Sequence, residues 1–197
     1  MMATETLTTE RILEATEEVL RQHGPAKANV VDVARALGVS HGSVYRHFGT
    51  KAQLREAVTK RWLDRTTNEL QLLMTDGSLT APAMLRQWLA TLFAAKRRKA
   101  GDDPQLFATY QVLITENSRV VELHVGELIM QLDHIIQDGI AKGQFSLPHP
   151  DPALTARAVF DATNRFHDPA YAGEWQKAGI DEEFRALTDL VLRGLNS

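Results

Sequence analysis

The segment from residue 33 to residue 51 constrains the fold more than any other, because it contains a helix end, a tight turn and a helix start. Gly38 follows an apolar run, where a residue with left-handed backbone commonly ends a helix. Ser40 then provides a side-chain oxygen that can cap a following helix. These signals predict two short helices joined by a turn. The apolar residues spaced to face one core are Val33, Leu37, Val39, Val44 and Phe48.

The second of these helices has a polar outer face. Once the apolar positions are assigned to the core, the residues left outside are His41, Ser43, Tyr45, Arg46 and His47. Hydroxyl, imidazole and guanidinium groups bind the phosphates and base edges of DNA. The pattern therefore predicts a DNA-binding helix-turn-helix, in which Arg46 either reads a guanine or holds a phosphate.

Composition and charge agree with a globular protein that has one basic part. The 197 residues are 44% hydrophobic, which is enough for a sizeable core. The net charge is −3, yet residues 33–61 hold six basic residues and one acid, and Arg55, Lys60 and Arg61 are expected to be solvated. The acidic remainder disfavours contact with nucleic acid elsewhere. The absence of Cys excludes thiolate metal sites and Cys nucleophiles.

Nearly every periodic stretch has helical spacing, and no strand alternation is convincing, so the chain is predicted to be all-α with about nine helices. Gly24-Pro25 is expected to stop the first helix, and Gly143 a later one. The first four predicted helices span about residues 9–23, 30–37, 41–48 and 51–74, and the next two end near residues 99 and 116. Two more span about residues 118–142 and 152–166, and the last begins at Asp181, which is expected to cap it.

The long helix over 51–74 joins the basic part to the acidic part. We place the domain boundary on this helix, which divides the chain into residues 1–55 and 56–197. The N-terminal residues do not have the pattern of a signal peptide, and no apolar run is long enough to span a bilayer. Together with the absence of Cys, this predicts a cytoplasmic protein with no membrane partner.

One pattern of residues runs from the first helix into the long one. It consists of Gly24, Val33-Ala34, Leu37-Gly38-Val39-Ser40, Val44-Tyr45-x-His47-Phe48, Lys51 and Leu54. The Tyr-x-His-Phe-x-x-Lys run is its most diagnostic part. Over residues 9–60 the chain thereby resembles the TetR family of bacterial transcriptional regulators, and beyond residue 66 it is similar in architecture only.

The resemblance implies that residues 1–55 bind a double-stranded DNA operator, and that residues 56–197 bind a small-molecule effector and form a homodimer. Tyr45 and Lys51 would hold phosphates. Val30 and Val31 stand where this family often has a hydroxyl or basic residue, so Asn29 and backbone N–H groups would anchor the phosphate there. The expected DNA contacts are Asn29, Ser40, His41, Gly42, Ser43, Tyr45, Arg46, His47 and Lys51.

The C-terminal helices bring large apolar side chains together with a few polar ones, which is the usual lining of a small-molecule site. Any one of these side chains is more often core, but as a set they predict an effector pocket. Its candidates are Trp88, Phe107, Tyr110, Gln111, His124, Phe160 and Asn164. Helix-turn-helix proteins usually read two half-sites as dimers. The candidates for the dimer interface, which could also be internal core, are Phe160, Phe184, Leu187 and Val191.

These patterns predict a ligand-responsive DNA-binding regulator, a repressor that a small molecule releases from a palindromic operator. Two alternatives stay open: a DNA-binding regulator controlled by a protein partner, and an all-α enzyme. The sequence has no recognised catalytic motif, so neither catalytic residues nor a cofactor is expected. A metal site is not expected either, because ligand spacing is lacking around His124, His134, His149 and His167.

Overall fold

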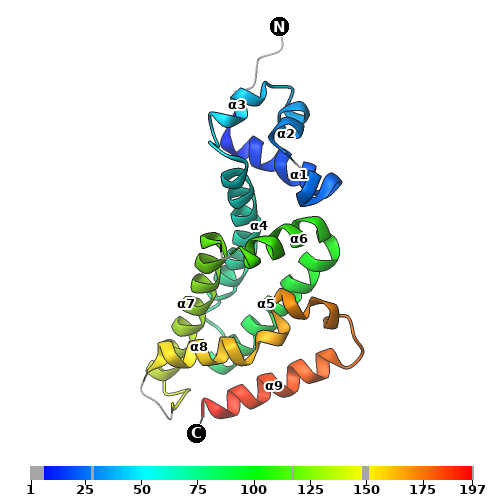
Figure 1. The fold of residues 1–197 in the computed structure, drawn as a ribbon. Coiled ribbons are helices and arrows are strands. Elements are labelled where there is room, and N and C mark those ends of the chain that lie inside the picture. Colours follow the sequence, from blue (N-terminus) through cyan, green and yellow to red (C-terminus); the bar gives the residue numbers. More distant parts are fainter. Residues whose placement is uncertain (1–6, 28, 117, 148–150, 197) are drawn as a thin grey trace. The chain divides into compact units, whose positions relative to one another are not determined.

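The computed structural model describes residues 7–27, 29–116, 118–147 and 151–196 (Figure 1). In these ranges it has nine α-helices and two short 3-10 helices, and the only β pairing is an isolated bridge between Ser146 and Asn196. The all-α prediction is therefore confirmed.

The first helix, α1 (Thr9–Lys27), contains a sharp break at the predicted position. Gly24 has φ 71° and ψ 174°, which are not helical values, and Pro25 follows it. Glycine adopts this backbone at little cost because it has no Cβ. The regular part of α1 therefore ends at Gly24, and the last residues form a separate turn.

The predicted helix-turn-helix is formed by α2 (Val30–Leu37) and α3 (His41–Tyr45). The Asn29 side chain accepts two hydrogen bonds from backbone N–H groups in the first turn of α2. Gly38 ends α2 with φ 66°, in the left-handed region. The Ser40 hydroxyl accepts a 3.2 Å hydrogen bond from the first turn of α3. In this unit, Asn29 and Ser40 thus cap the helices and Gly38 ends α2, as the sequence indicated.

The helix α3 ends at Tyr45, although the prediction extended it to Phe48. The N–H of His47 bonds to the carbonyl of Val44, three residues back, so the chain tightens after Tyr45. Phe48 nevertheless stays buried. This early end matters because Arg46 and His47 lie on a turn and not on a regular helix face.

The described chain divides into two compact units. Unit 1 comprises the residues up to Asp64 together with Asp102–Glu122, and unit 2 comprises Arg65–Gly101 together with the residues from Leu123 onward. The division falls within α4 (Lys51–Leu73), as the prediction placed it on this helix. The functional boundary between residues 55 and 56 stays a prediction.

Unit 1 includes α6 (Pro104–Thr115), which packs against α1. The Asp103-Pro104 pair in the sequence predicts an N-cap followed by a first-turn proline, and Asp103 does precede α6, but its carboxylate does not cap the helix. It instead accepts hydrogen bonds from Arg21 Nε at 2.6 Å and Trp62 Nε1 at 3.2 Å. The Trp62 ring also packs edge-on against Tyr110 of α6, 6.1 Å between centroids. The helix α6 is thereby attached to both α1 and α4.

Unit 2 contains most of α5 (Ala81–Asp102) and α7 (Arg119–Ala141), together with α8 (Pro152–Ala162) and α9 (Ile180–Gly194). Gly139 of α7 marks a close approach, because a Cβ there would overlap the Phe145 ring and lie 2.8 Å from Cβ of Ala81. The α7 helix ends before Gly143, which has φ 66°, as predicted. Two 3-10 helices, η1 (Asn164–Phe166) and η2 (Pro169–Glu174), lie between α8 and α9.

Two boundaries in unit 2 differ from the prediction. The helix α8 ends at Ala162, and the chain continues in a 3-10 turn in which the N–H groups of Phe166 and His167 bond to carbonyls three residues back. The helix α9 is preceded by Gly179 with φ 87°, and Asp181 lies inside its first turn. The Asp181 carboxylate accepts a 2.7 Å hydrogen bond from Arg97 instead of capping α9.

Candidate nucleic-acid interface

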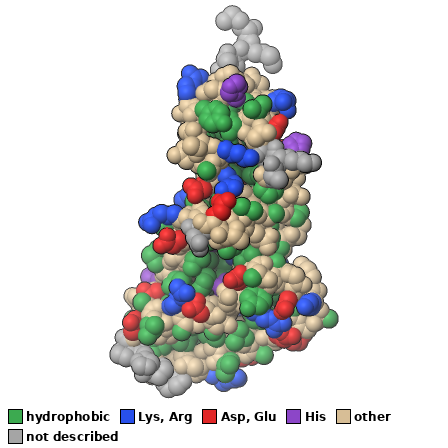
Figure 2. Space-filling model, in the orientation of Figure 1, with side chains coloured by type: hydrophobic (Ala, Val, Ile, Leu, Met, Phe, Trp, Pro, Cys, Tyr) green, Lys and Arg blue, Asp and Glu red, His purple; other side chains and the backbone are tan. Residues whose placement is uncertain are grey.

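The inward and outward faces of α3 are divided as the sequence predicted. Val44 is fully buried, whereas Tyr45 is 44% exposed. His41, Arg46 and His47 are also exposed. Figure 2 shows Lys, Arg and His side chains spread over the end of unit 1 that carries α2 and α3. The polar face of α3 is therefore available to a large partner.

A chain of hydroxyl groups holds the Arg46 guanidinium on this face. Arg46 Nη2 donates to Ser43 Oγ at 3.1 Å. The Ser43 and Ser40 hydroxyl oxygens lie 2.9 Å apart. Since Ser40 also caps α3, these two serines position Arg46 as well as offering contacts of their own. An Arg has five N–H donors, so a bond to Ser43 leaves donors for a base edge or a phosphate.

His47 is connected to α1. Its Nδ1 lies 3.3 Å from the hydroxyl of Thr9, the first residue of that helix. The sequence predicted DNA contact for His47, and this bond adds a role in holding the turn after α3. Thr9 was not predicted, because the contact joins residues far apart in the chain.

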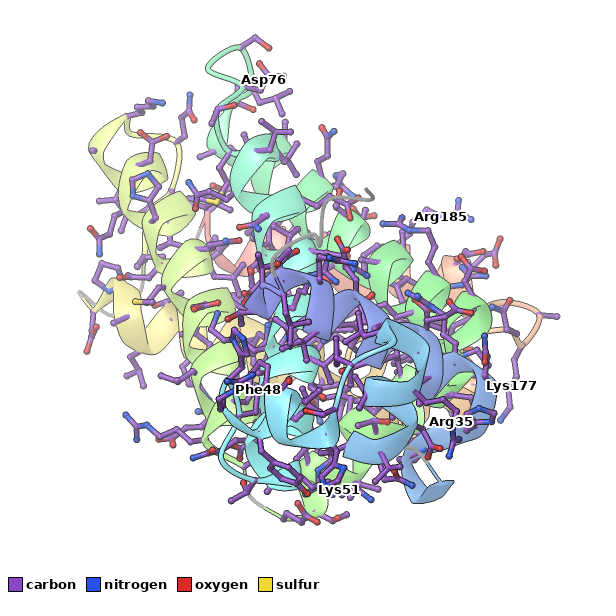
Figure 3. All side chains as sticks on the ribbon, turned by 90° about the horizontal axis from the view of Figure 1, so that it is seen from above. Arg35, Phe48, Lys51, Asp76, Lys177 and Arg185 are labelled. Carbon is purple, nitrogen blue, oxygen red and sulfur yellow. The ribbon has the colours of Figure 1, made fainter. Side chains whose placement is uncertain are left out.

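Lys51 begins α4 and is exposed. The Thr50 hydroxyl accepts a 3.1 Å hydrogen bond from the N–H of Gln53, which supports the start of this helix. A cation at a helix N-terminus is opposed by the helix dipole, at about 0.3–1 kcal/mol. Figure 3, which looks onto this end of unit 1, shows Lys51 and Arg35 at its rim. A phosphate bound beside Lys51 would offset the unfavourable charge.

The basic residues of unit 1 fall into two groups. Arg35 pairs with Asp32, Arg55 with Glu116 and Lys60 with Asp64, and Arg61 contacts three glutamates of α1. The expectation of solvated side chains agrees with Lys60, which is exposed, but is wrong for Arg55 and Arg61, which are half-buried and paired. Arg46 and Lys51 form no ion pair with another described residue, which leaves their charge for a partner.

Two predicted contacts have little freedom to act through their side chains. The side-chain oxygen of Asn29, Oδ1, accepts hydrogen bonds from two backbone N–H groups at the start of α2, so Asn29 orients the N–H groups there. Gly42 is exposed, and a Cβ added to it would meet only Ser40 Oγ at 3.8 Å, an ordinary contact. The fold of unit 1 therefore does not require glycine at this position.

The predicted effector residues are divided between the two units. Phe107, Tyr110 and Gln111 belong to α6 of unit 1, where the two aromatic rings pack 6.4 Å apart and Gln111 is exposed. The other four residues belong to unit 2. Trp88 is buried and donates to Gln131 at 2.9 Å, and Phe160 packs on His167. The remaining two are His124, which is buried, and Asn164, which is half-buried in η1.

The run Lys96-Arg97-Arg98-Lys99 at the end of α5 predicts solvated charges at a helix C-terminus. This prediction is wrong for Lys96, which is buried and contacts His124. The sequence did contain a signal, because Lys96 follows Leu92 and Phe93 at helical spacing and so lies on their buried stripe. His167 and Gln131 are further polar groups of unit 2 that the pattern did not single out.

The predicted dimer residues have mixed burial. Phe160 and Phe184 are buried in unit 2, and Phe184 packs 5.1 Å from both Phe93 and Phe166. Leu187 and Val191 are half-buried. The large exposed apolar groups of α8 and α9 are instead Leu154 and Leu190, which are 58% and 59% exposed.

Among the described residues, no group of three or more His, Asp and Glu side chains could hold a metal ion, and His149 lies outside those residues. The same part of the chain has no helix that is both long and apolar enough to cross a membrane.

An all-α chain with an exposed, capped α2–α3 unit at one end defines a protein of the helix-turn-helix class. The chain belongs to the tetR family of bacterial regulatory proteins. Residues 12–58 match the family model of that description, and residues 81–188 match the model of the tetracyclin repressor-like C-terminal domain.

Similar proteins include an uncharacterized HTH-type transcriptional regulator of Mycobacterium tuberculosis, 31% identical over 104 residues. That stretch covers 53% of this chain and 49% of the relative, so it spans about half of each. The HTH-type transcriptional repressor KstR2 of Mycolicibacterium smegmatis is 26% identical over 78% of this chain and 75% of its own length.

Solved structures with the same fold include a TetR transcription regulator from Haloarcula marismortui. It has a TM-score of 0.72 and 20% identity, over 95% of this chain and 97% of that one. The transcriptional regulator FadR from Bacillus subtilis, solved in complex with stearoyl-CoA, has a TM-score of 0.69 and 18% identity, over 96% and 100% of the two chains.

Proposed function

We propose that this protein is a cytoplasmic transcriptional repressor that binds a near-palindromic operator as a homodimer and is released by a small molecule. The observation that carries the proposal is the exposed polar face of α3 with Tyr45, the exposed Arg46 that follows it, and the exposed Lys51 at the start of α4. Membership of the tetR family and the similarity to the repressor KstR2 support the same function.

On DNA, α3 would lie in the major groove. Tyr45 and Lys51 would bind phosphates and set the register, which gives affinity without sequence preference. Arg46, held by Ser43, would meet a base edge, and a bidentate contact between Arg and guanine is the commonest specific pairing. The two copies of α3 in a dimer would then contact half-sites about 34–36 Å apart, or a multiple of that distance.

The helix α6 would transmit the effector signal. It belongs to unit 1, where Asp103 before it holds Arg21 and Trp62, and Glu116 after it pairs with Arg55. The helices that precede and follow it in the chain, α5 and α7, lie mostly in unit 2. A molecule that favours one arrangement of α5 and α7 would therefore bias α6, and couplings of about 1–3 kcal/mol are typical.

The homodimer would form through α8 and α9. Leu154 and Leu190 are large, exposed and apolar, and the half-buried Leu187 and Val191 lie near Leu190 in the sequence of α9. Apolar side chains of this kind are the usual core of an interface between identical chains.

Selection of bound sequences from random duplex DNA tests this function. We expect enrichment of a two-fold symmetric site, and an affinity for that site that falls steeply as salt rises, because phosphate contacts release counterions. A failure to enrich any sequence, together with an affinity that is flat in salt, would refute DNA-directed regulation.

A further inference from the structure

A groove in unit 1 lies where α1, α2 and α4 meet. Its lining comes from residues of these three helices and from Asn29, which precedes α2. The empty space is about 330 Å³, counted with the part that is open to solvent. This volume is near the lower end of the range for small-molecule sites, so it suits a single ring or a short chain.

The groove is lined mostly by apolar side chains. These are Leu20 and Pro25 of α1, Val30 and Val33 of α2, and Leu54 of α4. Pro25 lies just after the break at Gly24, in the separate turn at the end of α1. An apolar group in the groove would remove the remaining exposed surface of these side chains from water, which favours binding. None of these apolar residues belongs to the predicted DNA contacts.

The charged residues that line the groove are all positive. Lys51 and Arg55 lie one turn apart on α4, and no described Asp or Glu lines the groove. Two helices also begin beside it, α2 at Val30 and α4 at Lys51. The N-terminus of a helix carries a partial positive charge, so both helix dipoles add to the attraction for an anion.

One of these positive charges has no negative partner in the described chain. Arg55 pairs with Glu116, and Asp32, in the first turn of α2, pairs with Arg35. Lys51 is exposed and forms no ion pair with another residue in the described ranges. The groove therefore combines an apolar wall with one uncompensated ammonium group, which is complementary to an apolar molecule with a single negative charge.

We propose that this groove binds a small apolar carboxylate. The Lys51 ammonium would donate a charge-assisted hydrogen bond to a carboxylate oxygen. A ring or short chain would lie against Val30, Val33 and Leu54. Arg55 is already paired with Glu116 and would add only long-range attraction. A dianionic phosphate ester is disfavoured, because its second charge would meet no second unpaired cation among the described lining residues.

A carboxylate in this groove would act on DNA binding directly. Lys51 is one of the two residues proposed to hold phosphates, so a carboxylate on its ammonium would remove that contact. It would also place a negative charge where the DNA backbone approaches. This competition would take place within unit 1 and would need no signal from unit 2. It rests on the proposed function, whereas the carboxylate site itself does not.

NMR titration of the isotope-labelled, full-length protein without DNA tests the site. The probes are benzoate, acetate, which has the charge without the ring, and benzamide, which has the ring without the charge. We expect amide shifts at the groove residues, and benzoate should bind at least about tenfold more tightly than acetate because the ring leaves water. Since Lys51 is exposed, the gain of benzoate over benzamide should be smaller, about two- to fivefold.

Variants of two lysines on α4 separate the groove from the general surface. Lys51→Met should weaken benzoate binding to about the level of benzamide, and Lys51→Arg, which keeps the charge, should retain most of it. Lys60→Met removes an exposed lysine of the same helix that pairs with Asp64 and does not line the groove. This control should bind benzoate as the wild type does.

The competition is tested by measuring DNA affinity in benzoate and in acetate at the same concentration, which keeps the ionic strength equal. Benzoate should lower the affinity of the wild type more than acetate does, and this difference should shrink in Lys51→Met. If benzoate binds in the groove and the two salts lower DNA affinity equally, the competition is refuted and the site remains.

Four results would overturn the site. Equal affinities for acetate and benzoate would reduce it to an adventitious charge, and equal affinities for benzamide and benzoate would remove the role of Lys51. Amide shifts confined to unit 2, or unchanged binding by a folded Lys51→Met variant, would place the ligand elsewhere. If benzoate binds as expected but no DNA site is ever selected, the regulatory function fails and the carboxylate site stands. If a DNA site is selected and benzoate does not bind, the reverse holds.

Discussion

Replacing Lys96 by Met should make the protein more stable at neutral pH, although it removes a group that contacts His124. The folded state holds the pKa of Lys96 at about 8, against an ordinary value of 10.5 in the unfolded chain. This difference corresponds to about 3 kcal/mol by which the charged form destabilises the folded protein at pH 7. Met has a similar length and no charge, so it retains the apolar contacts of the stem.

The pH dependence gives the sharper test. Because the pKa is lowered on folding, the unfolded chain binds more protons between pH 8 and 10.5, and the contribution of Lys96 to stability rises with pH in this window. The advantage of Lys96→Met should therefore be largest below pH 8 and shrink towards pH 10.

The assay is denaturant unfolding followed by tryptophan fluorescence, at fixed protein concentration and at several pH values from 7 to 10. Only the difference between wild type and variant is interpreted, since other groups titrate equally in both proteins. Lys177→Met removes a lysine that is exposed, and its difference from wild type should not change with pH. A Lys96→Met variant that is less stable at pH 7, or whose difference from wild type is constant with pH, would refute the burial of a charged Lys96.

Three further predictions concern the same two units. Tyr45→Phe and Lys51→Ala should weaken binding to all DNA sequences by similar factors, whereas Arg46→Ala should cost about 1–3 kcal/mol on the preferred site and relax its sequence preference, as competition assays with mutated sites would show. Gly42→Ala should leave unit 1 equally stable or up to about 1 kcal/mol more stable in thermal unfolding, since a Cβ fits there. A loss of stability would contradict the packing. A loss of DNA affinity in a stable variant would mean that DNA approaches the backbone at this residue. The pKa of His167 is lowered to about 4, so its contribution to stability should be lost, by up to about 3 kcal/mol, as the pH falls from 6.5 towards 4. His167→Gln should remove that part of the acid sensitivity. Wild type and His167→Gln with the same dependence of stability on pH would count against a buried neutral imidazole.

The helix-turn-helix could be predicted from the sequence because its signals are local. Asn29 and Ser40 cap helices within three residues of themselves, and Gly38 adopts its left-handed backbone without any distant contact. The alternation of buried and exposed side chains follows from helical spacing alone. For the same reason Gly143 ends α7 at the predicted position.

The boundaries and roles that were mispredicted depend on distant partners. Asp181 was expected to cap α9, but Arg97 of α5 binds its carboxylate. Arg61 was expected to be solvated, but glutamates of α1 surround it, more than forty residues away in the chain. Local pattern cannot show such pairs, because either residue alone is compatible with a solvated surface.

The sequence by itself determined that this chain is all-α, where the recognition segment lies and which of its side chains face outward, since capping and periodicity act over a few residues. Only the tertiary structure decided that α6 packs with the DNA-binding helices and that Lys96 is enclosed with His124. Burial of a charge is a property of everything packed around it, and the surrounding residues come from segments far apart in the chain.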